Sequence, residues 1–142
     1  MFIRSISSGA HEPKESKDCT VRALANASGM PYGDAHKALQ SKGRLTGHGC
    51  RASVWHEAYT SNGLKFVGVY GKGNTAKGFI RVYPMKPLKG ITLGALLPTL
   101  GLGRFVVVIT GHAIAVINGS IIDRGGNSSK QHVVALYKCK EV

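Results

Sequence analysis

The stretch HAIAVINGSIIDRGG, residues 112–126, contains the strongest structural signal in the chain. Asn118-Gly119 stands between two apolar runs, and this dipeptide favours the two-residue type I′ turn of a β-hairpin. Such a turn also sets the register of the two strands, in which Ile114 opposes Asp123. The stretch therefore predicts an antiparallel hairpin with its turn at residues 118 and 119.

The same register brings a histidine close to a carboxylate. Side chains alternate between the two faces of a strand, so His112 shares a face with Ile114. Asp123 is then on that face as the diagonal neighbour of His112. Diagonal neighbours lie about 7–8 Å apart, within the reach of side chains that hydrogen-bond to each other. We expect an imidazole–carboxylate pair at this end of the hairpin.

Around the hairpin, the period of the apolar residues divides the chain into two parts. Apolar residues repeat at helical spacing before Gly63 and mostly at strand-like spacing after it. The pattern predicts helices over 19–29, 32–43, 53–63 and 92–101, and strands over 65–70, 78–83, 104–110, 112–117, 120–123 and 132–138, with a flexible basic loop at 71–77. Helices followed by an antiparallel sheet are typical of an α+β fold. The length of 142 residues suits a single domain, 1–142.

The first predicted helix begins with a cysteine. In KDCTVRALANASG, residues 17–29, Asp18 can cap a helix, Cys19 is its first residue and Gly29 can end it. A helix N-terminus carries a positive dipole, which stabilises a thiolate. A thiol hydrolase needs a thiolate, a histidine that carries the proton and a polar group that orients the histidine. Cys19, His112 and Asp123 supply these three groups, provided that the helix end meets the hairpin.

The composition limits the classes of function. The chain is 43% hydrophobic and 18% charged, which excludes a disordered chain, and its net charge is +12. This charge attracts anionic partners, so nucleic acid or an acidic protein is a possible partner. Three cysteines without a repeated spacing fit a reducing compartment rather than a disulfide framework. We expect neither a signal peptide nor a membrane-spanning segment.

The order of the motifs resembles that of known proteins. A helical cysteine followed by a sheet that carries histidine and then aspartate resembles the papain-like cysteine peptidases. DCTVRALANASGMPYGDAHKAL (18–39) together with GHAIAVINGSIIDRGG (111–126) looks more closely like a family of small phage proteins, which pair a DC-x-x-RA helix with a late H-x-x-A-V-x-x-G-x-x-x-D hairpin. The resemblance covers most of the chain. It implies a papain-like core with N-terminal helices packed on a C-terminal antiparallel sheet, with Cys19, His112 and Asp123 at the site, and a location in the host cytoplasm or the virion.

One departure from the papain-like pattern concerns the oxyanion. Those enzymes usually have a glutamine or a similar donor a few residues before the cysteine, whereas this chain has HEPKESKD there. The candidate substitutes are the side chains of His11, Lys14, Ser16 and Lys17, alongside the backbone N–H of Cys19. The loss of one such donor typically costs about 10²–10³-fold in rate.

Three functions fit these patterns. The first is a cysteine hydrolase, a peptidase or isopeptidase that acts on a protein or peptide and needs no metal or organic cofactor. The second is a weak or inactive enzyme that serves as a basic binding module for nucleic acid or an acidic host protein. The third is a transferase that passes an acyl group to an amine.

Blander interpretations stay open beside these functions. Cys19 alone can be a core residue, His112 a polar strand end and Asp123 a turn residue. A metal site is a weak alternative, because its candidate ligands match no recognised zinc spacing: His48, Cys50, His56 and Cys139. The substrate and the oligomeric state are not indicated by the sequence.

Overall fold

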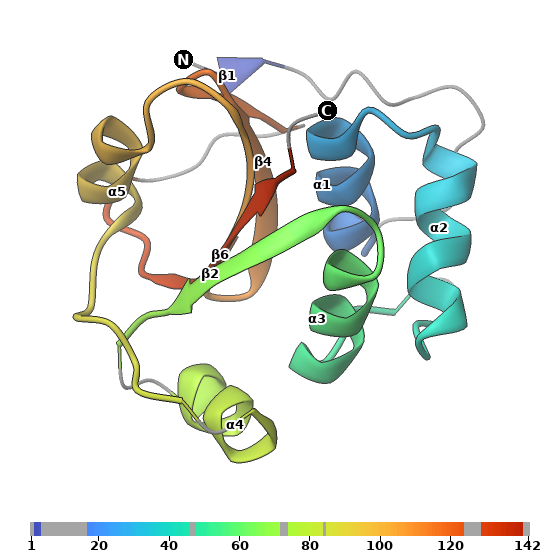
Figure 1. The fold of residues 1–142 in the computed structure, drawn as a ribbon, viewed down its shortest axis with the longest axis horizontal. Coiled ribbons are helices and arrows are strands. Elements are labelled where there is room, and N and C mark those ends of the chain that lie inside the picture. Colours follow the sequence, from blue (N-terminus) through green and yellow to red (C-terminus); the bar gives the residue numbers. More distant parts are fainter. Residues whose placement is uncertain are drawn as a thin grey trace.

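The computed structural model describes residues 2–3, 17–45, 48–71, 74–83, 85–123 and 129–140 (Figure 1). The helices are α1 (Cys19–Ser28), α2 (Tyr32–Ser41), α3 (Ala52–Thr60), α4 (Asn74–Val82) and α5 (Leu93–Leu100). The strands are β1 (Phe2–Ile3), β2 (Leu64–Val69), β3 (Arg104–Ile109), β4 (His112–Ile117), β5 (Ser120–Ile122) and β6 (Val133–Cys139). The predicted α+β class is confirmed.

The described strands form one sheet, with the order β1-β5-β4-β3-β6-β2. Helices α1, α2 and α3 lie on one side of it and α5 on the other (Figure 1). Each face has its own core. Ala113 and Ala115 of β4 belong to the core that includes residues of α1, α2 and α3, whereas Ile114 and Val116 belong to the core under α5. The sheet is therefore buried on both faces, which explains the nearly continuous apolar runs of β3, β4 and β6.

The predicted hairpin is present with the predicted register. Ile117 pairs with Ser120 and Val116 with Ile121. Asn118 has φ 50° and Gly119 has φ 83°, the two left-handed conformations that a type I′ turn requires. Pairing between β4 and β5 ends at Ile122, so Asp123 lies one residue beyond the strand.

Helix α1 is the central helix, and it packs against both β4 and α2. All its residues from Thr20 to Ala27 are buried. Gly29 ends it with φ 81°, a left-handed conformation in which its N–H donates to the carbonyl of Ala25, as the sequence predicts. Alanines on α1 and on the facing side of β4 allow the helix to lie close to the sheet.

The prediction of a strand over residues 78–83 is wrong, because these residues belong to α4 and the segment that follows it. A strand would alternate Phe79, Arg81 and Tyr83 on one face. The helix instead brings Phe79 and Tyr83 together, with ring centroids 5.1 Å apart, and leaves Arg81 and Val82 exposed. Phe79 also stacks on Trp55 at 5.6 Å. Burial of these aromatic rings decides between two periods that a six-residue window leaves ambiguous. The basic loop predicted at 71–77 is correspondingly shorter, since α4 begins at Asn74.

The N-terminal segment departs from the expectation in one place. Residues 1–17 have no predicted element, yet Phe2 and Ile3 form β1, which pairs in parallel with Ile121 and Ile122 of β5. The sheet is thus antiparallel except at this edge. None of the helices in the described residues is long and apolar enough to cross a membrane.

Candidate active site

Cys19 is the first residue of α1, and its thiol is half-buried. Burial raises the pKa of this thiol, but hydrogen bonds from His112 and from the backbone N–H of Ala113 lower it, as do the positive charges of His112 and Arg22. The net effect is a lowered pKa. The helix dipole acts in the same direction, because the sulfur lies at the positive end of α1. These interactions favour a thiolate at position 19.

His112 lies between the thiol and a carboxylate. Its Nε2 is 2.7 Å from Oδ2 of Asp123, and its side chain is 27% exposed. The hydrogen bond to Asp123, followed by the one to Cys19, raises the pKa of His112 to about 9. Because Nε2 faces the carboxylate, Nδ1 is the ring nitrogen left for the sulfur. The structure therefore brings together all three residues that the sequence singles out, in the order thiol, imidazole, carboxylate.

The sequence argument placed the histidine on the wrong face of the sheet. Strict alternation puts His112 with Ile114, whose side chain packs under α5, on the opposite face from α1. His112 nevertheless reaches Cys19 because it is the first residue of β4, directly after the turn at Thr110-Gly111. Alternation constrains side chains inside a strand much more than at its end. The register predicted the pairing correctly, and the strand ends set its direction.

A buried arginine joins the helix to the hairpin, and sequence reasoning missed it. Arg22 donates through Nε to Oδ1 of Asp18 at 2.9 Å and through Nη1 to Oδ1 of Asp123 at 3.1 Å. Asp123 thus accepts from Arg22 with one oxygen and faces His112 with the other. The arginine fixes the carboxylate that orients the imidazole. A signal was available, since Asp18 and Arg22 have the i, i+4 spacing of a helical ion pair.

Asp18 has a different role from the one predicted. It precedes α1, but its side chain makes no capping hydrogen bond to the helix. The carboxylate is fully buried and accepts instead from Arg22 and, at 2.8 Å, from the hydroxyl of Tyr32 on α2. A buried charge needs such partners, because desolvation without them costs several kcal/mol. The network Asp18–Arg22–Asp123–His112–Cys19 therefore connects α2, α1 and the hairpin.

Tyr32→Phe tests the outer end of this network. We expect the variant to lose about 1.5–3 kcal/mol of unfolding free energy, because the hydrogen bond to a buried carboxylate is lost. Chemical denaturation followed by circular dichroism measures the loss. Tyr83→Phe is the matched control, since the Tyr83 hydroxyl donates to Glu57 at 2.7 Å in an exposed contact. Equal losses in the two variants would contradict a special role for the buried contact.

The predicted oxyanion donors are only partly visible. His11, Lys14 and Ser16 lie outside the described residues. Lys17 has an exposed side chain, and its carbonyl accepts from Arg44 Nη2 at 3.1 Å. As the first residue of α1, Cys19 has a backbone N–H without an acceptor inside the helix, so this N–H is available to an oxyanion.

The other two cysteines have the opposite character. Burial raises the pKa of Cys50, whose sulfur is 3.3 Å from the Thr20 hydroxyl. Burial also raises the pKa of Cys139 to about 11, and its thiol donates to the carbonyl of Ala27 at 3.1 Å. Both are therefore neutral thiols near neutral pH. Of the three cysteines, Cys19 is the one whose environment favours the thiolate.

The weak alternative of a metal site finds no support in the geometry. His56 contacts the Tyr137 hydroxyl through Nδ1 at 2.6 Å within an aromatic cluster. Cys50 and Cys139 bond to opposite ends of α1, at Thr20 and Ala27. Within the part of the chain that the structure describes, no three histidine, cysteine or acidic residues lie close enough to hold a metal ion.

Comparison of the chain with models of protein families, with characterised proteins and with solved structures gives no match. A function for this site has to be argued from its geometry.

Proposed function

We propose that the chain is a cysteine hydrolase with a papain-like core, a peptidase or isopeptidase that acts on a protein or peptide. One observation carries the proposal. A thiol with a lowered pKa stands at a helix N-terminus and is hydrogen-bonded to a histidine that a buried carboxylate orients. Nucleophile, base and orienting group in this order are what covalent acyl transfer requires.

In the first half of the reaction, Cys19 attacks the carbonyl carbon of the substrate. The proton of its thiol resides on Nδ1 of His112, so the sulfur attacks as a thiolate. The new C–S bond forms as the C=O π electrons move to oxygen, and the backbone N–H of Cys19 donates to this oxyanion. When the intermediate collapses, the C–N bond breaks and His112 gives its proton to the leaving amine. The product is a thioester on Cys19 and a free amine.

In the second half, water replaces the amine. His112, now neutral, accepts a proton from a water molecule, whose oxygen attacks the thioester carbon. The C–S bond breaks, the acid product leaves, and the thiolate–imidazolium pair is restored. Asp123 keeps the imidazole oriented in both halves, and its charge stabilises the imidazolium.

The proposal is tested with a peptide mixture, because it names a bond type and not a sequence. We expect incubation of the protein with a peptide library, made by digesting a bacterial lysate, to produce new peptide termini detected by mass spectrometry. Cys19→Ala and His112→Ala should abolish these termini, since they remove the nucleophile and the base. Cys139→Ala is the matched control and should keep the activity.

Two outcomes would count against the hydrolase. New termini that persist in Cys19→Ala would come from another source. If the library and a set of isopeptide-linked peptides both stay intact while Cys19 remains in the folded protein, the chain does not hydrolyse such bonds.

A further inference from the structure

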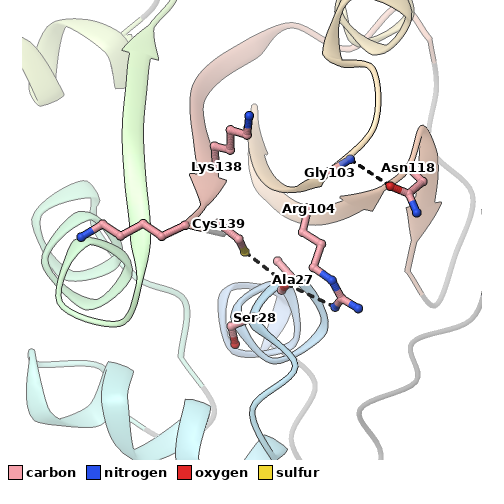
Figure 2. A pocket seen from close by; sticks show the side chains of 8 residues that line it. Ala27, Ser28, Gly103, Arg104, Asn118, Lys138 and Cys139 are labelled. Atoms are coloured by element: carbon pink, nitrogen blue, oxygen red, sulfur yellow. Dashed lines mark hydrogen bonds between the residues drawn. The ribbon is translucent and has the colours of Figure 1, made fainter. Parts of the chain in front are cut away.

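A second feature lies at the opposite end of α1 from Cys19. A cavity of about 360 Å³ opens there, where the helix C-terminus meets the ends of β3 and β6 (Figure 2). Its lining comes from two helix residues, the turn of the β4–β5 hairpin and the strand ends: Ala27, Ser28, Gly103, Arg104, Asn118, Lys138, Cys139 and Lys140. Ten helical residues separate it from the thiol by about 14 Å, so it is not part of the proposed active site.

The charge of this lining is not compensated. Arg104, Lys138 and Lys140 are all exposed, and the lining contains no acidic residue. Two of the four acidic residues within the described ranges, Asp18 and Asp123, are buried in the network of the active site. Lys65 adds a further cation, because it pairs directly with Lys138 across β2 and β6. Like charges in that position repel each other, and a bound anion would relieve the repulsion.

The polar groups of the cavity are mostly donors. Asn118 accepts from the N–H of Gly103 at 2.9 Å through its Oδ1, which leaves its NH₂ group to donate. The thiol of Cys139 and Nη1 of Arg104 both point to the carbonyl of Ala27, at 3.1 Å and 3.5 Å (Figure 2). They occupy the one helix carbonyl at the cavity that would otherwise repel an anion. Donors and cations without a free acceptor select a negatively charged ligand.

The cations do not converge on one point. Figure 2 shows the guanidinium of Arg104 directed toward α1 and the ammonium of Lys138 directed away from it. The Lys138 ammonium lies 5.8 Å from the centroid of the Phe105 ring, which holds it on the other side of the strand ends. A single phosphate ion cannot contact both. Charges spread over the end of the sheet fit an extended polyanion with successive charges.

An apolar hollow of about 460 Å³ adjoins the basic cavity, and Asn118 lines both. Leu97, Pro98 and Leu102 line the hollow, and Leu102 is 82% exposed. A single nucleic-acid strand has charged phosphates along one edge and the flat faces of unpaired bases along the other. We propose that this surface binds a single-stranded nucleic acid, with phosphates on the cations and bases over the apolar hollow.

The test measures binding of a fluorescein-labelled 20-nucleotide single strand by anisotropy at about 50 mM salt. The triple variant Arg104→Gln, Lys138→Gln, Lys140→Gln should weaken binding at least tenfold. The slope of log affinity against log salt should fall by about 2, since each phosphate neutralised on a single strand contributes about 0.7. The matched control, Lys37→Gln, Lys42→Gln, Lys89→Gln, makes the same charge change at exposed positions outside the cavity and should weaken binding less.

Further arms separate this proposal from its competitors. Leu102→Ser should weaken the strand and leave the salt slope unchanged, because it removes an apolar contact. Cys19→Ala should bind normally, which keeps the result independent of the hydrolase. Equal weakening in the two triple variants would overturn the site, as would the absence of binding. Competition by inorganic phosphate beyond that of chloride at equal ionic strength would indicate a single-anion pocket instead. A poly-glutamate peptide that competes as well as the strand would overturn the assignment to nucleic acid.

Discussion

Replacement of Arg22 by methionine is expected to lower the free energy of unfolding by about 3–5 kcal/mol. Methionine keeps the length and the helix propensity of the side chain but removes the charge. Asp18 is fully buried and Asp123 is 6% exposed, so both carboxylates would be left without their cation. Breaking a buried ion pair from one side costs about this much. Denaturant titration at neutral pH measures the change.

Two comparisons make this result specific. Arg81→Met removes an exposed arginine from α4 and should change stability by less than about 0.5 kcal/mol. The double variant Arg22→Met, Asp18→Asn should lose less than the sum of the two single variants, because the asparagine no longer needs the cation. A loss for Arg22→Met no larger than that for Arg81→Met would mean that the two carboxylates do not depend on the arginine.

Local rules were enough to predict the elements that carry the site. Asn118-Gly119 specifies its turn because both positions need φ above zero, and that turn sets which residues pair. Gly29 ends α1 for a similar reason. Cys19 at the start of the helix followed from the same pattern of periodicity. These features depend on residues close in sequence, and the structure reproduces them.

The rest depends on contacts between distant residues. Arg22 and Asp123 are separated by 101 positions, and no local pattern indicates their contact. The helix at α4 forms because Phe79 and Tyr83 stack with rings of α3 and β2, which a strand could not achieve. The reach of His112 toward α1 depends on its place at the end of β4. Tertiary packing thus decided both errors, and the site itself needed the helix and the hairpin to meet.

Alkylation of Cys19 by iodoacetamide is expected to be fast at pH 6 and to depend on His112. An ordinary thiol with a pKa of about 8.5 is only about 0.3% ionised at this pH. The lowered pKa of Cys19 keeps a larger fraction as thiolate, and imidazolium supports it up to about pH 9, the pKa of His112. The rate should therefore rise at a lower pH for Cys19 than for Cys50 and Cys139, which serve as controls in the same peptide digest.

Two variants separate the imidazole from the carboxylate. In His112→Ala, burial of the thiol is no longer opposed by the imidazolium, so the rate at pH 6 should fall by about 10–100-fold. Asp123→Asn should cost less at pH 6, because a histidine with an ordinary pKa of about 6.5 is still mostly protonated there. Its deficit relative to the native chain should grow as the pH rises above 6.5 toward 9, where only the carboxylate keeps the imidazole charged. If Cys19 reacts no faster than the other two cysteines and His112→Ala changes nothing, the hydrogen bonds at this site do not activate the thiol.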